Sequence, residues 1–587
     1  MKKICICEGT EQIQTFYVNN YEEEHVMAWY DEAIFYHIYP LGLCDAPKEN
    51  SYAAPVHRLN EVLPWITHIK KIGCNALYIG PLFESVGHGY ETTDYKKLDS
   101  RLGDNADLAN FVKECHAQGI KVIFDGVFNH VGRDFFAFKD LQANRENSRY
   151  RDWFCNVNFG GNNEYNDGFC YENWGGYNLL VKLNQHNPDV KNYICDVIRF
   201  WVSEFDVDGI RLDAADVLDF EYMRMLRTVA NEVKPDFWLM GEVIHGDYTR
   251  WVNGDTLHAV TNYALHKALY SGHNDHNYFE IAHTVKRLYE MGGNRPDGLK
   301  LYNFVDNHDV ARIYTKLNNK AHFTPVHVLL YTLPGVPSIY YGSEFGIEGR
   351  KEKFSDASLR PALKYEDYAD ATETNSFTKL IAALGKARQS SLELSYGAYR
   401  ELLLTNRQYA FARELNGTSA LVAVNNDDNA ADFHLAASGC SSYVGALSGN
   451  HVNVENGQIH VTVGANSGEI WLPVTDNCAA DDTEKEPVVL NVNDAVADVP
   501  AGNAPVETAA PIPETTPDPS PEPQPAPAAA PVSDSDRDAF ERGKIAGLQE
   551  AILAIMEKNG PVTDQMRRDV ENNVYHDSLI NWVKSFR

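Results

Sequence analysis

Two kinds of stretch alternate along the chain between residues 30 and 345. Short runs of apolar, β-branched or aromatic residues are each followed by a longer stretch with apolar residues at helical spacing. The runs are "AIFYHIYP", "ALYIGP", "KVIFDGVF", "GIRLD", "FWLMGEV", "AVTNY", "KLYNFVD" and "SIYYG". Each is apolar enough to be buried on both faces, as parallel strands covered by helices must be. The eight runs predict an α/β fold with a (β/α)8 TIM barrel over residues 30–388, although alternation alone also permits an open, doubly wound sheet.

Helix signals support the helical half of this pattern. In "HNPDV", Asn187 suits an N-cap and Pro188 suits the first helical position. In an earlier stretch Val62, Ile66 and Ile69 form one apolar face, and Gly73 suits the C-terminal cap. These signals predict helices that begin and end between the strand candidates.

The rest of the chain divides by composition. A stretch rich in Asn, Gly and aromatic residues after the third strand predicts an inserted subdomain B over the barrel mouth, and alternating runs such as "SALVAVNN" and "EIWLPV" predict an antiparallel β-sandwich domain C. An acidic, Pro/Ala-rich stretch predicts a disordered linker, and the final stretch predicts a helical tail that docks back, self-associates or contacts another protein. The expected segments are 1–29 (N-terminal extension), 131–178 (inserted subdomain), 389–474 (sandwich), 475–535 (linker) and 536–587 (tail).

Charge and cysteine content narrow the classes of partner and compartment. The formal net charge of −30 disfavours nucleic acid and anionic membranes, so neutral ligands are the expected partners. The chain shows neither a secretory signal pattern nor a run of about 18 apolar residues that would predict a transmembrane helix. The ten cysteines form no CxxC pair, which favours reduced thiols and a cytoplasmic protein over a disulfide framework or a zinc site.

Charged side chains gather where the predicted barrel strands end. The active site of such a barrel lies at the C-terminal ends of its strands. A single polar residue there is ordinary, but folding gives no reason to bury several like charges together. Clustered carboxylates suit glycoside hydrolysis, which needs a nucleophile or base and a protonated carboxyl as acid. The residues are Asp125, Asn129, His130, Arg211, Asp213, Glu242, His308 and Asp309.

Four of these strand ends resemble the signature regions of the alpha-amylase family, glycoside hydrolase family thirteen. They read "DGVFNH", "GIRLDAAD", "GEVIHG" and "FVDNHD", in the family's order. The resemblance extends from about residue 33 to about residue 474 and does not cover the linker or the tail.

The resemblance implies a role for each matching residue. Asp213 resembles the nucleophile of a retaining mechanism, Glu242 the general acid/base, and Asp309 the third carboxylate that binds sugar hydroxyls. Residues implied in substrate binding are Tyr90, Asp125, His130, Arg211 and His308, of which Arg211 also pairs with the nucleophile and Tyr90 stacks on the sugar. In "YNFVDNHD", we expect Asp306 and Asn307 to brace the turn that presents His308 and Asp309.

Substrate and cofactor expectations follow from finer matches. "VKLN" resembles the fifth region of the neopullulanase and cyclodextrinase group, and Ala214 resembles α-1,4-active members. Asp216 and Val217 replace the Lys-His pair of many starch-degrading amylases, which favours short maltooligosaccharides or cyclodextrins over long polymers. No cofactor is required, and Asn129 matches a position that binds calcium in many amylases, which leaves a calcium ion open.

The resulting hypothesis is a retaining α-glucoside hydrolase that cleaves α-1,4-linked glucooligosaccharides. One alternative is a 4-α-glucanotransferase or another transglycosylating, sucrose- or trehalose-active relative on the same scaffold. An alternative of another class is a non-catalytic carbohydrate-binding or scaffold protein, in keeping with how little a fold alone says about function.

Overall fold

The computed structural model describes residues 28–292, 298–353 and 355–474. The chain separates into two compact units, Met1–Ala501 and Gly502–Arg587, and all described residues belong to the first. The predicted linker (475–535) and helical tail (536–587), and all but the last two residues of the predicted N-terminal extension, therefore lie outside the described residues.

Eight parallel strands form the barrel, and they coincide with the eight predicted runs. Their order in the sheet is β11-β10-β9-β5-β2-β1-β13-β12, and a parallel bridge between Thr261 and Tyr302 joins the two outermost strands. The sheet is therefore closed, so the barrel is confirmed and the open sheet is excluded. The strands are β1 (Phe35–Ile38), β2 (Ala76–Ile79), β5 (Lys121–Gly126), β9 (Gly209–Leu212), β10 (Trp238–Gly241), β11 (Ala259–Val260), β12 (Tyr302–Phe304) and β13 (Val336–Tyr340).

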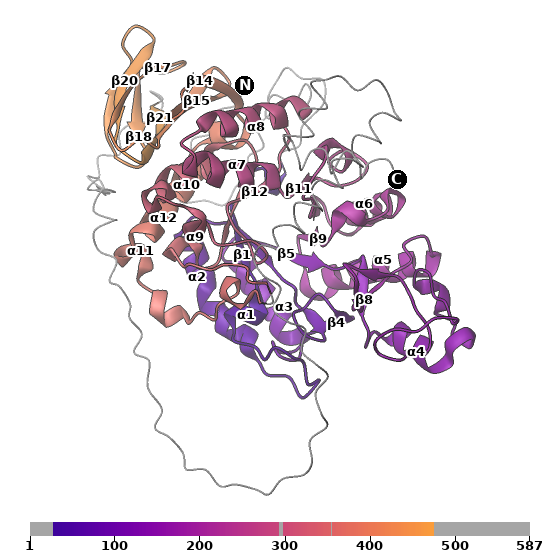
Figure 1. Ribbon diagram of the computed structural model, residues 1–587. Helices are drawn as coiled ribbons and strands as arrows, with labels where there is room; N and C mark the ends of the chain where they lie inside the picture. Colours follow the sequence, from indigo (N-terminus) through magenta and orange to yellow (C-terminus); the bar gives the residue numbers. More distant parts are fainter. Residues whose placement is uncertain (1–27, 293–297, 354, 475–587) are drawn as a thin grey trace, which may run out of the picture. The chain divides into compact units, whose positions relative to one another are not determined.

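The two faces of each barrel strand are buried against different parts of the molecule. Inward-pointing side chains, among them Phe35, Tyr78, Ile123 and Trp238, fill the barrel as one apolar cluster. Outward-pointing side chains pack in a second apolar cluster. Helices surround the strands (Figure 1). The helices are α1 (Pro40–Leu43), α2 (Leu63–Lys71), α3 (Asn105–Ala117), α5 (Pro188–Phe205), α6 (Phe220–Val233), α7 (Tyr263–Asn274), α8 (Tyr278–Met291), α9 (Ile313–Lys316), α10 (Phe323–Thr332), α11 (Ala371–Thr374), α12 (Ser376–Gln389) and α13 (Leu392–Tyr396).

The predicted helix ends are present. Asn187 caps α5, because its side-chain oxygen accepts the backbone N–H groups of Asp189 and Val190 while Pro188 occupies the first helical position. Gly73 follows α2 with a φ of 80°, a left-handed conformation that glycine adopts without strain. Such local signals fix where each helix begins and ends, and so where each strand end meets the barrel mouth.

Two additions follow the second and third barrel strands. A short hairpin of β3 (Phe83–Ser85) and β4 (Thr92–Leu98) follows β2, and the sequence pattern did not predict it. The predicted insertion after the third strand contains α4 (Phe136–Asn144) and a three-stranded antiparallel sheet of β6 (His130–Gly132), β7 (Asn173–Trp174) and β8 (Tyr177–Lys182). This sheet continues to Lys182, four residues past the expected boundary at residue 178.

The predicted antiparallel domain follows the barrel. A six-stranded sheet, in the order β14-β15-β16-β21-β18-β19, and the pair β17-β20 share one apolar core that includes Phe433, Ile459 and Trp471. The strands are β14 (Ala398–Leu404), β15 (Gln408–Leu415), β16 (Thr418–Asn425), β17 (Ala431–Ala436), β18 (Ser442–Gly445), β19 (His451–Asn453), β20 (Gln458–Val463) and β21 (Ser467–Val474).

Within the described part of the chain, none of the helices combines the length and apolar character needed to cross a bilayer.

Candidate active site

Arg211 joins three of the predicted site carboxylates at the C-terminal ends of neighbouring strands. Its Nη1 donates to Asp125 Oδ1 at 2.8 Å and to Asp213 Oδ1 at 2.9 Å, and its Nη2 lies 2.8 Å from Glu242 Oε2. Asp125 and Arg211 are strand residues of β5 and β9, whereas Asp213 and Glu242 directly follow β9 and β10. The guanidinium group is almost fully buried. The structure therefore brings three sequence-predicted carboxylates together around one sequence-predicted cation.

This arrangement leaves negative charge in excess. Burial raises the pKa of Asp213 well above its usual value, and the charges of Glu242 and Asp125 raise it further against the opposing effect of Arg211. A carboxylate held at this cost to stability, at a strand end of a barrel, is typical of a reacting group.

Glu242 is held at both of its carboxylate oxygens. Oε2 accepts the backbone N–H of Ala214 at 3.1 Å in addition to its contact with Arg211, and the hydroxyl of Tyr263 donates to Oε1 at 3.4 Å. Ala214 can direct its N–H there because its φ is 46°, in the left-handed region that non-glycine residues seldom adopt. This strained residue directly follows Asp213, so the turn positions both carboxyls at once.

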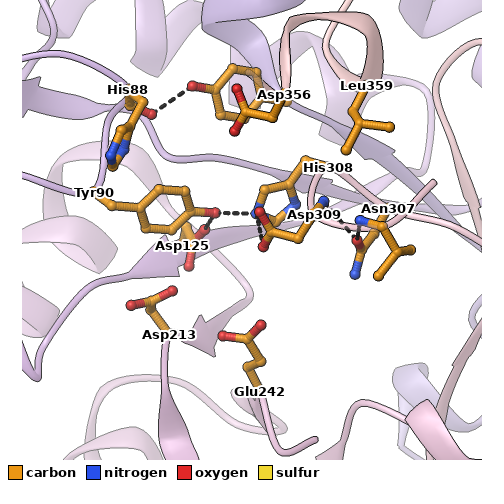
Figure 2. Close-up of polar contacts among 12 residues, drawn as sticks. His88, Tyr90, Asp125, Asp213, Glu242, Asn307, His308, Asp309, Asp356 and Leu359 are labelled. Carbon is orange, nitrogen blue, oxygen red and sulfur yellow. Dashed lines mark hydrogen bonds and ion pairs between the residues drawn. The ribbon is translucent and has the colours of Figure 1, made fainter. Parts of the chain in front are cut away.

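The third carboxylate belongs to a separate network. Arg360 Nη2 and His308 Nε2 both lie 3.1 Å from the Asp309 carboxylate. Burial would raise the pKa of Asp309, but the charges of His308 and Arg360 hold it well below its usual range. In Figure 2 the carboxyl groups of Asp213 and Glu242 point toward the space that His308 and Asp309 face.

Tyr90 links the two networks. Its hydroxyl donates to Asp125 Oδ2 at 2.9 Å and contacts His308 Nε2, and its ring lies nearly parallel to that of His308 (Figure 2). Tyr78 donates to the same oxygen of Asp125 at 2.8 Å. Asp125 therefore accepts from three protein donors, and it holds Arg211 and Tyr90 in place.

His130 lies at the start of the inserted sheet. Burial lowers its pKa to about 3, so the ring is neutral at pH 7. Its Nε2 is buried and has no hydrogen-bond partner among the described residues, and its ring lies parallel to Trp174, 6.5 Å away. A neutral imidazole with one nitrogen unused can bind a hydroxyl group of a ligand.

The side chain of Asn129 is occupied by protein contacts. Its Oδ1 accepts Gln185 Nε2 at 3.1 Å, and its Nδ2 contacts His130 Nδ1 at 3.2 Å. Calcium takes six to eight oxygen ligands, and the contact with Gln185 uses one of the two acceptor positions of the Asn129 oxygen. Among the described residues, the one group of three or more His, Cys, Asp and Glu side chains close enough to share an ion is His57, Asp104 and Asp107. The Asn129 side chain alone does not provide a calcium site.

The two other polar residues of "YNFVDNHD" make the contacts expected of turn-bracing groups. Asp306 accepts the backbone N–H of Ile313 at 2.7 Å and the hydroxyl of Ser343 at 2.8 Å. Asn307 Oδ1 accepts the N–H groups of Asp309 and Val310 (Figure 2).

Sequence reasoning missed three residues that contact the predicted site. Arg360 pairs with Asp309, Tyr263 contacts Glu242, and Tyr78 contacts Asp125. Arg360 lies in an irregular loop after β13, where hydrophobic periodicity gives no signal. Tyr78 and Tyr263 look like core aromatics in the sequence, so only the position of their hydroxyl groups shows the contact.

Comparisons with known proteins identify a family and several relatives of this chain. The family described as "Alpha amylase, catalytic domain" matches residues 49–390. A cyclomaltodextrinase from a Bacillus species is 32% identical over 423 residues, which cover 68% of this chain and 74% of that protein. Neopullulanase 2 of Thermoactinomyces vulgaris is 30% identical over 482 residues, covering 78% and 80% of the two chains. A solved cyclomaltodextrinase structure superposes with a TM-score of 0.65 at 26% identity and covers 76% and 78% of the two chains.

Proposed function

The chain belongs to the alpha-amylase family of glycoside hydrolases, and on this premise we propose that it hydrolyses α-1,4-linked glucooligosaccharides with retention of anomeric configuration. One observation carries the proposal: Asp213 and Glu242 contact adjacent nitrogens of a single buried guanidinium group. Such close carboxyls favour the separation of about 5 to 5.5 Å found in retaining enzymes over the wider spacing of inverting ones.

The proposed reaction has two steps. In the first, an oxygen of Asp213 bonds to the anomeric carbon while the glycosidic bond breaks, and Glu242 gives its proton to the departing oxygen. In the second, Glu242 takes a proton from water, the water oxygen bonds to the anomeric carbon and Asp213 leaves. Asp309, aligned by Arg360 and His308, binds hydroxyl groups of the same sugar.

The proposed substrates are short maltooligosaccharides and cyclodextrins. Asp216 and Val217, which stand where many starch-degrading amylases carry Lys-His, are exposed beside the catalytic carboxylates. The similarity to a cyclomaltodextrinase and a neopullulanase points the same way.

We also propose a cytoplasmic enzyme, because the seven cysteines within the described residues are all free thiols.

Transfer to a second sugar is the second candidate. Val217 and Ile244, four residues after Asp213 and two after Glu242, are 37% and 39% exposed. Such apolar surface beside the acid/base favours an acceptor sugar ring over water.

Product analysis tests both candidates. The protein is incubated with maltotriose, β-cyclodextrin, pullulan and starch, and an Asp213→Asn variant serves as the control. Shorter products from maltotriose and opened cyclodextrin support hydrolysis, and products longer than maltotriose support transfer. An active Asp213→Asn variant contradicts the mechanism, and an inactive wild type favours a non-catalytic carbohydrate-binding protein.

A further inference from the structure

The two oxygens of Glu242 lie in unlike surroundings. Oε2 faces two N–H donors, Arg211 Nη2 at 2.8 Å and the backbone of Ala214 at 3.1 Å. A proton on Oε2 would point toward these donors, so the exchangeable proton of an acid/base at this position belongs on Oε1. The hydroxyl of Tyr263 lies 3.4 Å from Oε1.

The position of Tyr263 is fixed by its element. It is the first residue of α7, directly after the N-cap Asn262, whose side chain accepts the N–H of Leu265. Its ring packs edge-on against Phe304 of β12 at a centroid distance of 4.9 Å. The start of α7 and the barrel core together hold the ring in place. Only the hydroxyl hydrogen of Tyr263 can then still rotate, about its C–O bond.

Asn307 determines where that hydrogen points. Its Oδ1 accepts the N–H groups of Asp309 at 2.8 Å and Val310 at 3.1 Å, so the amide cannot be reversed without losing both bonds. Its Nδ2 therefore faces Tyr263 and donates to the hydroxyl oxygen at 3.3 Å. With its oxygen accepting from Asn307, the hydroxyl directs its own proton at Glu242 Oε1.

We propose that Tyr263 is a positioning residue for the acid/base Glu242 and that Asn307 couples this contact to the turn carrying Asp309. The inference rests on the proposed function and adds a part to it. A hydroxyl donor stabilises the ionised form of Glu242, the form that takes a proton from water in the second step. The same amide holds the backbone N–H of Asp309, so one side chain aligns both carboxylates.

The remaining charged groups around these residues set the direction of the pH effect. Glu242 also faces Arg211, Asp213 and Asp216, and Tyr263 also faces Asp309 and Arg211. Burial, followed by the charges of Glu242 and Asp309, raises the pKa of Tyr263 well above its usual value, so its hydroxyl stays protonated and able to donate at every working pH. Removing the hydroxyl therefore leaves the ionised carboxylate of Glu242 with one donor fewer.

The first test is the Tyr263→Phe variant assayed on maltotriose across pH. We expect the basic limb of kcat/KM to move upward by about 0.5 to 1 pH unit, because the ionised acid/base has lost a donor. We expect kcat to fall by about 3- to 30-fold, since a hydrogen bond to a charged group is lost. A basic limb that stays within about 0.2 unit of wild type overturns the inference.

A second variant tests the coupling. In Asn307→Asp, one carboxylate oxygen still accepts the two N–H groups, and the other attracts the Tyr263 hydroxyl proton away from Glu242. We expect an upward shift of the basic limb that is clearly larger in the wild-type background than in the Tyr263→Phe background. Equal shifts in both backgrounds would mean that the added charge acts directly, which overturns the coupling through Tyr263.

Tyr302→Phe is the matched control. It removes another buried barrel hydroxyl, one that bonds Ser338 Oγ instead of a carboxylate, and we expect it to leave the basic limb unchanged. Failure of the proposed function is separable, because it appears as a wild-type protein that does not cleave maltotriose. An active wild type with an unshifted Tyr263→Phe profile overturns the inference alone.

Discussion

Strand β9 has an aspartate directly before it and another directly after it, and their surroundings are opposite. Asp208, at the N-terminal end, contacts His116 at 2.7 Å and both Lys121 and Lys234 at 2.9 Å. Asp213, at the C-terminal end, shares Arg211 with Asp125 and Glu242. One end supplies three basic groups for two acids, because His116 and Lys234 also contact the exposed Asp206. The other end supplies one basic group for three acids.

The pKa directions follow this difference. Burial would raise the pKa of Asp208, but His116, Lys234 and Lys121 hold it well below its usual range. Burial and like charges raise the pKa of Asp213. Both side chains are buried, so burial does not separate a structural acid from a catalytic one. The balance of charge separates the structural acid from the catalytic one, in keeping with the division of a TIM barrel into a stabilising and a catalytic face.

The largest expected effect comes from Asp213→Asn. We expect kcat on maltotriose to fall by about 10⁴-fold or more, as for loss of a nucleophile. Removing one of three like charges relieves repulsion with Glu242 and Asp125, so the thermal midpoint should stay equal or rise. Activity assays and thermal unfolding check this pair of outcomes. A strongly lowered midpoint would make Asp213 a structural residue like Asp208.

Asp208→Asn should give the reverse result. Breaking its paired contacts should lower the free energy of unfolding by about 2 kcal/mol, less than for a fully enclosed ion pair because the basic partners are partly exposed. We expect kcat to stay within about twofold of wild type, since the residue lies at the stabilising face of the barrel. Denaturant titration and initial rates provide the measurement. Loss of activity in a folded Asp208→Asn variant would contradict a purely stabilising role for Asp208.

Acidification should separate the two aspartates in one protein. Because the folded pKa of Asp213 is raised, the acidic limb of kcat/KM should lie clearly above pH 4, while the fold persists. Because the folded pKa of Asp208 is depressed, its contribution to stability is complete above its unfolded pKa of about 3.9 and is lost only as pH falls below that. Rates and far-UV circular dichroism measured at the same pH values check this order, and simultaneous loss of both signals would contradict it.

The smallest expected effect concerns calcium. The Asn129 oxygen already accepts Gln185 Nε2, so we expect a chelator to move the thermal midpoint by less than about 1 °C, well under the effect of losing 1 kcal/mol. Thermal unfolding with EDTA and with added Ca²⁺ provides the measurement, and a large stabilisation by Ca²⁺ would show that other ligands complete a site.

Much of the fold and of the candidate active site was predictable from the sequence. The eight strands could be predicted because each is a short apolar run between helical patterns, and Asp213 and Glu242 stood out because each directly follows such a run. The hairpin β3–β4 was missed because "TTDYKKL" is half polar and resembles a loop. Arg360 and Tyr263 reach the site through the packing of distant segments, which periodicity along the chain does not record. The pairing of Asp208 was hidden for the same reason, since its partners come from three other parts of the chain.

The most direct test of the account is covalent labelling of Asp213. A mechanism-based fluoroglucosyl fluoride, which forms the glycosyl-enzyme faster than the second step removes it, is incubated with the wild type and with Asp208→Asn, and the peptides are analysed by mass spectrometry. We predict one fluoroglucosyl group on the peptide that contains Asp213 in both proteins. A label on a different carboxylate, or turnover of maltotriose to the inverted anomer without any label, would contradict it.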